Sequence, residues 1–457
     1  MTSFNILLKL TGSLLAVAAG LCAQQTVIVR VSPGSAALVD ATYGLTVVRS
    51  LDSSGNVQLV SFPDTVSRGA FLAAAALNPL IASAEIEQQT EVGESDSRSV
   101  AENSTVSGTV DPLVPGSSAL VSYFGNMVRQ GYAAQPAALL INLPAAQAGF
   151  GTGAALVAVI DSGVDPDHPV LKNVFVPGYD FLTNTPGIPS EITDVSQSTV
   201  ALLDQVSQPV VSNALEPLQL NQSTVALLDQ STVALLDQST VALLDSTQLP
   251  KAFGHGTMIA GLIHLVAPGV KIMPLRAFYA DGSGNISDIV NAIYYATDHG
   301  ANVINMSFSS TSPSAALTAA IQYALAHKVI CVAAAGNLGR EIKVYPASIK
   351  GVIGVGSTNG ADLRSGFSNY DDGCARTAAP GEALITSYPR GNYAGVWGTS
   401  FSAALVSGTV ALGKSASPRG SMGNVGDALD SGHKISDQGI GDARLDVLSY
   451  LKCIRNP

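Results

Sequence analysis

The chain has 457 residues, of which 47% are hydrophobic and 12% are charged, and its formal net charge at neutral pH is −11. This length predicts a folded protein of more than one domain, because a domain usually has about 100–200 residues. The acidic balance and the lack of a basic patch argue against nucleic acid as a partner.

Residues 1–23 have the pattern of a secretory signal peptide. A short segment that ends at Lys9 precedes an apolar stretch, and Ala23 supplies a small residue for cleavage. A lipid anchor on Cys22 is the alternative, which the preceding Leu21 disfavours. The apolar stretch is too short to span a bilayer comfortably, and no later stretch is long enough. We therefore expect a secreted, extracellular protein with no membrane association after signal removal.

Residues 24–92 predict a small α+β domain. Short β-branched runs ("TVIVRV", "YGLTVVRSL", "NVQLVSF") predict strands, "AFLAAAALN" predicts a helix, and "IASAEIEQQT" predicts a further strand. Residues 93–127 then form an expected linker, because most of this stretch is polar and rich in Ser, Gly and Pro.

From residue 128 to residue 457 the pattern predicts an α/β domain. The runs "AALVAVID", "KVICVAAAGN" and "GVIGVGST" are almost continuously apolar, and helical patterns such as "SDIVNAIYYATDHG" and "PSAALTAAIQYALAHK" separate them. Such strands are buried on both faces, so we expect a parallel sheet with helices on both faces. Chemistry in these folds gathers at the carboxyl ends of the strands.

Four residues with catalytic potential lie at such positions. Asp161 ends a strand in "VAVIDSGVDPDHP", His255 opens a helix in "GHGTMIAGL", Ser400 opens another in "GTSFSAALVSG", and Asn337 ends "AAAGN". Asp, His and Ser can form a nucleophilic relay. Asn337, together with the backbone N–H of Ser400, can stabilise the oxyanion of acyl transfer. Each residue alone also fits a cap or a turn, but the four together favour catalysis.

These segments resemble the subtilases, the subtilisin-like serine endopeptidases. The order Asp161, His255, Ser400 and the motifs D-[ST]-G, H-G-T and G-T-S carry the resemblance. It covers roughly residues 128–452 and includes "YPASIKGVIGVGSTN", "FSNY" and "APG". It implies a subtilisin-like fold, a secreted serine endopeptidase made as a zymogen, and a propeptide over residues 24–92 that assists folding and blocks the cleft.

The resemblance also implies where substrate and ions bind. The partners would be protein or peptide substrates and the chain's own propeptide, and we expect a monomer. No cofactor would be required; a structural calcium ion is an open alternative, for which Asp165 and Asp167 are candidate ligands. The implied substrate-binding residues are two backbone segments and a pocket wall: Gly282, Ser283, Gly284; Ser307, Phe308, Ser309; Ala334, Ala335, Gly336.

The sequence departs from the family pattern beside the nucleophile. Ala404 and Leu405 replace the usual proline and histidine, Phe401 replaces the commoner methionine, and Ser309 replaces a common glycine. These changes leave open a second interpretation, in which the chain is a non-catalytic binding or adhesion protein that keeps the subtilase fold.

An octapeptide, "QSTVALLD", occurs three times in tandem over residues 222–245 and once at residues 197–204. The repeat falls in the gap between Asp161 and His255, which is longer than in most subtilases. We interpret residues 186–249 as an insertion. Its even period would suit stacked short strands. A duplicated surface loop is the simpler interpretation, since each doubling of loop length costs only about 0.6 kcal/mol.

Overall fold

The computed structural model describes residues 26–62, 67–92, 120–195, 234–235, 250, 252–371, 373–417, 422–436 and 439–455. The expected signal peptide, most of the expected linker and nearly all of the octapeptide repeat lie outside these residues. None of the described helices is long and apolar enough to cross a membrane.

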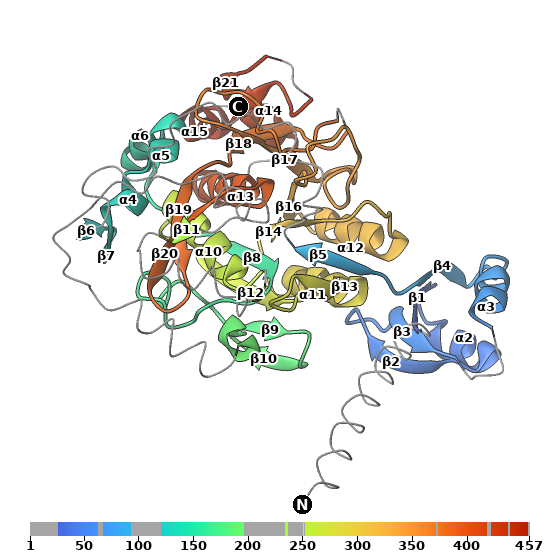
Figure 1. Cartoon of the computed structure of the whole chain (residues 1–457). Helices are drawn as coiled ribbons and strands as arrows, with labels where there is room; N and C mark the ends of the chain where they lie inside the picture. Colours follow the sequence, from blue (N-terminus) through green and yellow to red (C-terminus); the bar gives the residue numbers. More distant parts are fainter. Residues whose placement is uncertain are drawn as a thin grey trace, which may run out of the picture.

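A small α+β domain comes first, as the sequence predicts (Figure 1). Its antiparallel sheet has the order β2-β3-β1-β4, and alternate residues of β1, such as Val27 and Val29, pack against Phe71. The helix at residues 36–43 was not expected. The elements are β1 (Thr26–Val31), α2 (Ala36–Tyr43), β2 (Thr46–Ser50), β3 (Val57–Ser61), α3 (Arg68–Ala75) and β4 (Ile81–Ile86).

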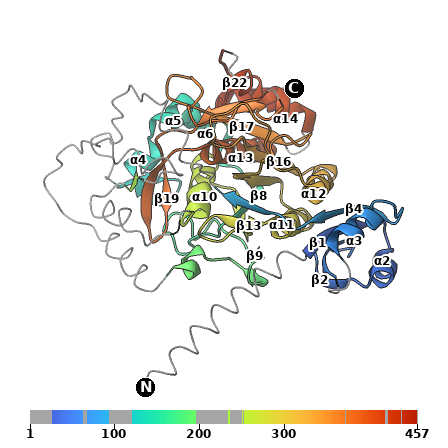
Figure 2. The ribbon, with the colours of Figure 1, turned by 45° about the vertical axis from the view of Figure 1, so that its right-hand side comes forward.

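The prediction of a single strand over "IASAEIEQQT" is wrong. The segment instead contributes to two strands, β4 and β5 (Gln89–Val92), which belong to different sheets. β4 stays in the small domain, whereas β5 lies between β13 (Ser283–Asn285) and β15 (Phe308–Ser309) of the large domain. Both ribbon views show β5 reaching from the small domain into the large one (Figures 1 and 2).

The large domain is built on a ten-stranded sheet, which confirms the predicted parallel architecture. The interior strands pair in parallel, and only the outermost pairs, β10/β9 and β21/β22, are antiparallel. In spatial order the strands are β10 (Thr185–Gly187), β9 (Gly178–Asp180), β12 (Lys271–Arg276), β8 (Leu156–Asp161), β14 (Val303–Met306), β16 (Ile330–Ala334), β17 (Ile353–Thr358), β18 (Thr377–Pro380), β22 (Ala443–Arg444) and β21 (His433–Lys434).

Helices cover both faces of this sheet, so its strands face two separate cores. Val157 and Val159 of β8 belong to one core, and the alternate residues Ala158 and Ile160 belong to the other. The first core contains α6 (Leu143–Phe150), α10 (His255–Val266), α13 (Thr399–Ala416) and α15 (Val447–Arg455), and the second contains α11 (Ile286–Asp298) and α12 (Ala315–Ala326).

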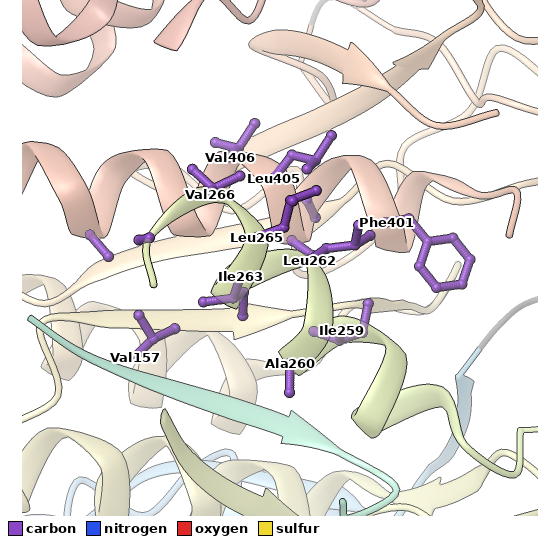
Figure 3. Close-up of a cluster of buried hydrophobic side chains, with 14 of the residues drawn as sticks. Val157, Ile259, Ala260, Leu262, Ile263, Leu265, Val266, Phe401, Leu405 and Val406 are labelled. Carbon is purple, nitrogen blue, oxygen red and sulfur yellow. The ribbon is translucent and has the colours of Figure 1, made fainter. Parts of the chain in front are cut away.

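Helices α10 and α13 pack against each other over most of the length of α10 (Figure 3). Phe401 and Leu405, two of the residues that depart from the family pattern, are each 1% exposed and belong to this apolar contact. They replace polar or flexible side chains with apolar packing, which explains why the helix behind Ser400 accepts them.

Smaller elements complete the large domain. Residues 120–129, the first part of which was expected to be linker, form the hairpin β6/β7, and Tyr123 donates a hydrogen bond to the carbonyl of Leu265. The other elements are β6 (Leu120–Tyr123), β7 (Asn126–Arg129), α4 (Gln130–Ala133), α5 (Pro136–Leu140), the 3-10 helix η1 (Glu191–Asp194), β11 (Ala234–Leu235), β19 (Leu384–Tyr388), β20 (Asn392–Val396) and α14 (Met422–Leu429).

Candidate active site

Asp161 and His255 form a buried pair at the carboxyl end of β8. The Nδ1 atom of His255 lies 2.8 Å from Oδ1 and 3.0 Å from Oδ2 of Asp161, and each residue is only 1% exposed. The backbone N–H of Ser162 also donates to Asp161 Oδ1 at 2.8 Å. Because the carboxylate binds Nδ1, the other imidazole nitrogen, Nε2, is available for a proton transfer. Nε2 has no hydrogen-bond partner among the described residues.

Close backbone contacts bring this pair together. A Cβ on Gly256 would lie 1.9 Å from the carbonyl oxygen of Gly163, so the first turn of α10 and the loop after β8 touch without side chains. Gly163 also has a φ of +104°, a conformation that other residues rarely adopt. The glycines of the D-S-G and H-G-T motifs therefore allow the approach of the strand end to the helix.

Ser400 is the second residue of helix α13 and lies beside Ser307, the residue between β14 and β15. Its Oγ donates to the carbonyl oxygen of Ser307 at 3.0 Å, and Ser400 is 4% exposed. The aromatic ring of Phe401 lies 5.6 Å from the imidazole of His255 between centroids. The backbone N–H of Ser400 lies in the first turn of the helix, where amides lack intrahelical partners and the helix dipole favours negative charge.

Asn337 lies at the same end of the sheet with its amide group oriented. Its Oδ1 accepts hydrogen bonds from the backbone N–H and the hydroxyl of Thr399, both at 2.9 Å. Because the carbonyl end of the side chain is engaged, the NH₂ end is the free donor. It lies beside Gly398, where an added Cβ would be 3.6 Å from Nδ2.

The two predicted substrate segments flank a strand of the chain itself. Val92 of β5 pairs with Phe308, and its N–H donates to the carbonyl of Gly282 at 2.8 Å. On the other edge, Ser283 and Gly284 pair with β5 in the antiparallel sense. The predicted segments therefore form the two edges of one β-sheet with an extended strand between them. Ser309 takes part in this pairing and is 4% exposed.

The predicted pocket residues follow β16. Ala334 and Ala335 are 2% and 0% exposed, and the N–H of Gly336 donates to the Thr399 hydroxyl at 3.1 Å. Thr399, the residue before Ser400, thus connects this segment to the start of α13.

Glu191 is a buried residue at this site that the sequence did not single out. It is 0% exposed, and its Oε2 accepts a hydrogen bond from the N–H of Gly254 at 3.0 Å, next to His255. It lies in η1, inside the range that we interpreted as an insertion from residue 186. Its backbone N–H donates to the carbonyl of Val164, in the loop after Asp161, at 3.3 Å. The one signal was an acidic residue in a short polar segment, which is too common to be informative.

One of the two candidate calcium ligands, Asp165, already accepts hydrogen bonds from the backbone. Asp165 Oδ1 accepts a hydrogen bond from the N–H of Asp167 at 3.1 Å, and Oδ2 accepts one from the N–H of Arg390 at 2.7 Å. Within the described ranges there is no group of three or more His, Cys, Asp or Glu residues arranged for a metal ion. A calcium requirement stays a prediction.

Known proteins resemble this chain over much of its length. Residues 152–430 match the family described as Peptidase_S8, the subtilase family. The chain is 32% identical over 272 residues to a thermophilic serine proteinase of Bacillus sp. (strain AK1), an alignment covering 57% of this chain and 52% of that protein. It is 36% identical over 208 residues to thermitase of Thermoactinomyces vulgaris, covering 43% of this chain and 74% of thermitase.

A solved structure has the same fold. Fervidolysin of Fervidobacterium pennivorans, described as a keratinolytic enzyme related to subtilisin, superposes with a TM-score of 0.64 at 19% identity, over 94% of this chain and 61% of fervidolysin. The chain thus spans about half the length of the thermophilic serine proteinase and more of thermitase. The family match extends over more than half of the residues, and the chain belongs to the subtilase family.

Proposed function

We propose that the chain is a serine endopeptidase that hydrolyses peptide bonds through an acyl-enzyme. Ser400 Oγ attacks the substrate carbonyl, His255 Nε2 takes the serine proton, and Asp161 holds Nδ1–H and stabilises the imidazolium that forms. The proton then passes to the leaving amine, and water repeats the sequence to release the acyl group. The observation that carries the proposal is the buried contact of 2.8 Å between Asp161 and His255 at the carboxyl end of β8.

Two donors serve the oxyanion in this mechanism. The Asn337 amide, whose oxygen is occupied by Thr399, offers its NH₂ group, and the N–H of Ser400 offers the second bond. Donors fixed before the reaction stabilise developing charge without reorganisation.

The pairing of β5 supports production as a zymogen. Peptide substrates of this enzyme would bind as an antiparallel strand between β13 and β15, a mode that reads backbone groups and accepts many sequences. β5 has that arrangement and directly follows the small domain in the sequence. We therefore propose that the small domain is a propeptide, which blocks the cleft until the chain is cleaved after β5. Export would follow from the expected signal at residues 1–23.

A fluorophosphonate probe tests the nucleophile. The secreted chain should become labelled and should hydrolyse casein. Ser400→Ala should lose both properties and should remain unprocessed, while an Asn173→Ala variant, changed at an exposed residue, should behave as the parent does. An unlabelled parent chain with no casein hydrolysis would instead favour a non-catalytic binding protein.

A further inference from the structure

The segment at residues 189–191 pairs with the loop that follows Asp161. The N–H of Val164 donates to the carbonyl of Pro189 at 3.0 Å, and the N–H of Glu191 donates to the carbonyl of Val164 at 3.3 Å. A Cβ on Gly163 would meet the backbone of both Pro189 and Glu191 at about 3 Å. This backbone pairing places the Glu191 side chain next to the segments that carry Asp161 and His255.

The carboxyl group of Glu191 faces three donors from two elements. The N–H of Gly254 donates to Oε2 at 3.0 Å, and the Ser162 hydroxyl lies 3.3 Å from the same oxygen. The Thr257 hydroxyl donates to Oε1. Gly254 and Thr257 flank His255, and Ser162 follows Asp161, so a single buried carboxyl group joins the two backbone segments that carry the catalytic pair.

We propose that Glu191 is a positioning residue of the catalytic centre, whose carboxyl group locks the loop after Asp161 to the first turn of α10 and so aligns the imidazole of His255. This inference rests on the endopeptidase function proposed above. In this role Glu191 does not contact the substrate. It acts through its hydrogen bonds with Ser162, Gly254 and Thr257.

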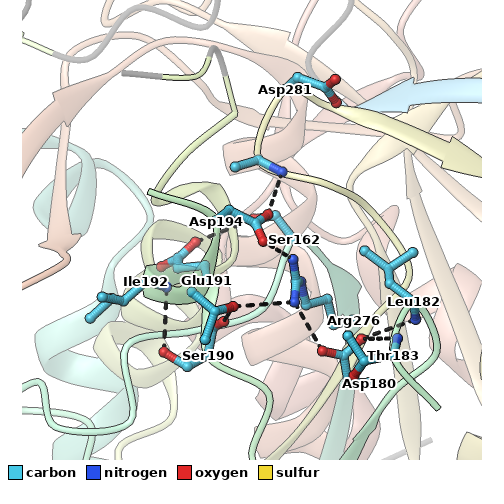
Figure 4. A network of polar contacts seen from close by, with 12 residues as sticks. Ser162, Asp180, Leu182, Thr183, Ser190, Glu191, Ile192, Asp194, Arg276 and Asp281 are labelled. Carbon is cyan, nitrogen blue, oxygen red and sulfur yellow. Dashed lines mark hydrogen bonds and ion pairs between the residues drawn. The ribbon is translucent and has the colours of Figure 1, made fainter. Parts of the chain in front are cut away.

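The 3-10 helix that carries Glu191 is anchored at its other end (Figure 4). Asp194 accepts hydrogen bonds from the guanidinium of Arg276 and, at 2.9 Å, from the N–H of Ala280. Arg276 is 3% exposed and also donates to Asp180 at 2.9 Å. Glu191 is therefore held on a rigid support, which a positioning role requires.

Ionisation of Glu191 adds a second readout. Burial, with a further contribution from the charges of Asp161 and Asp165, raises the pKa of Glu191 to about 8, although the hydrogen bonds from Thr257 and Ser162 oppose the shift. The titratable groups that face it are Asp161 at the end of β8, Asp165 on the loop after β8, His255 at the start of α10 and Tyr388 on β19.

The protonated form still connects the site. A protonated Glu191 can donate to Ser162 Oγ, which in turn lies 3.3 Å from Asp161 Oδ1. When the proton is lost above about pH 8, the new negative charge lies near a pair that carries an imidazolium in the transition state, and it should speed the reaction.

The experiment compares mature parent enzyme with Glu191→Ala, Glu191→Gln and Glu341→Gln, the last changed at an exposed glutamate. Active sites are first titrated with a fluorophosphonate, so that kcat refers to reactive enzyme only. Failure of the parent to react overturns the proposed function and is seen before any variant is compared. The low-field proton resonance of the Asp161–His255 hydrogen bond is recorded as well, because it needs no turnover.

We expect Glu191→Ala to lower kcat by about 10- to 100-fold with KM changed by no more than about twofold, because small misplacements of a catalytic group have effects of this size. Glu191→Gln keeps one acceptor and should recover much of kcat at pH 7, but it should lose the rise in kcat above pH 8. The low-field resonance should shift in Glu191→Ala and not in Glu341→Gln. Parent-like kcat and pH profile, or an unchanged resonance, in Glu191→Ala overturns the positioning role. If Glu191→Ala does not fold, a Glu191→Gln variant that keeps both an unshifted low-field resonance and the alkaline rise overturns it.

Discussion

Ser400 and Ser307 exchange hydrogen bonds. The Ser400 hydroxyl donates to the Ser307 carbonyl at 3.0 Å, and the Ser307 hydroxyl donates to the Ser400 carbonyl at 2.9 Å. Behind them, Asn305 Nδ2 donates to the Ser307 hydroxyl at 2.8 Å, and the Ser407 hydroxyl donates to Asn305 Oδ1 at 2.9 Å. A buried polar chain therefore fixes the nucleophile's helix to the strand β14 and to the substrate-binding edge.

Ser307→Ala should make the protein less stable, because it removes the acceptor of the buried amide of Asn305. We expect the free energy of unfolding to fall by about 1–3 kcal/mol, the usual cost of an unsatisfied buried donor. Urea unfolding in the Ser400→Ala background, which prevents autolysis, measures it. Ser312→Ala, at an exposed serine, is the control, and equal stability of the two variants would contradict the prediction.

Asn337→Leu should lower kcat by about 10²- to 10³-fold with a modest change in KM, since it removes an oxyanion donor. Leucine also removes the acceptor of Thr399, so Asn337→Asp is the matched variant: it keeps an acceptor for Thr399 and has no NH₂ donor. Kinetics on a peptide ester measure both. A parent-like kcat for Asn337→Asp would show that the amide donor has no role.

The affinity of the small domain for the large domain should depend on pH. Burial of Glu87, whose side chain accepts a hydrogen bond from the N–H of Ser287 at 2.9 Å, raises its pKa to about 7, the nearby Asp288 adds to the shift, and Arg49 opposes it. Because the raised pKa favours the protonated acid in the complex, this stabilisation is complete below the ordinary pKa of 4.5 and is lost as the pH rises through about 7.

Dissociation of the cleaved small domain should therefore accelerate between pH 5 and pH 8. Glu87→Gln, which cannot ionise, should flatten that dependence, whereas Glu91→Gln, at an exposed residue of β5, should keep it. Stopped-flow recovery of activity after a pH jump follows the release. A pH-independent rate in the parent protein would refute the role of Glu87.

Maturation should cut close to the end of β5. Val92 pairs with Phe308, and the residue before Phe308, Ser307, accepts a hydrogen bond from the hydroxyl of Ser400. Because β5 ends at Val92, next to the segment that contacts Ser400, we expect the cleaved bond to follow the next residue of the sequence, Gly93. N-terminal sequencing of freshly processed protein should begin at Glu94, and Ser400→Ala should show no such product. A first cut far along the linker, near residue 119, would disprove the register argument.

Deletion of residues 222–245 should leave maturation and small-ester hydrolysis near normal, since none of the three copies contributes a residue to the proposed mechanism. Deletion of residues 190–195, which removes Glu191 and Asp194, is the contrasting variant and should abolish activity. If the repeat deletion prevents folding, the repeat is part of the structure. If it spares folding and stops ester hydrolysis, the repeat shapes the active site.

Local sequence signals were sufficient for the sheet and for the positions of Asp161, His255 and Ser400. An apolar run ending in a polar residue predicts a buried strand with a side chain at its carboxyl end, and an apolar periodicity predicts the helices that begin at His255 and Thr399. These signals depend only on residues close together in the chain, so the strands and helices can be predicted from the sequence alone.

Contacts between distant segments were not predictable in the same way. Glu191 reaches the site through backbone pairing with Val164 and through the anchoring of Asp194 by Arg276, neither of which leaves a periodic pattern. The division of "IASAEIEQQT" into β4 and β5 likewise depends on which strands lie beside it. Both results follow from pairing across long separations, which local propensity does not encode.

One pairing gives the repeat an unusual property. Ala234 and Leu235 of β11 lie in the middle tandem copy and pair with Gly395 and Ala394 of β20. Each copy of the octapeptide contains the same two residues at its fifth and sixth positions. A chain that has gained or lost one octapeptide copy can still pair an identical Ala-Leu segment with β20. The length of this region can therefore change in steps of eight residues while the sequence of the edge strand stays the same.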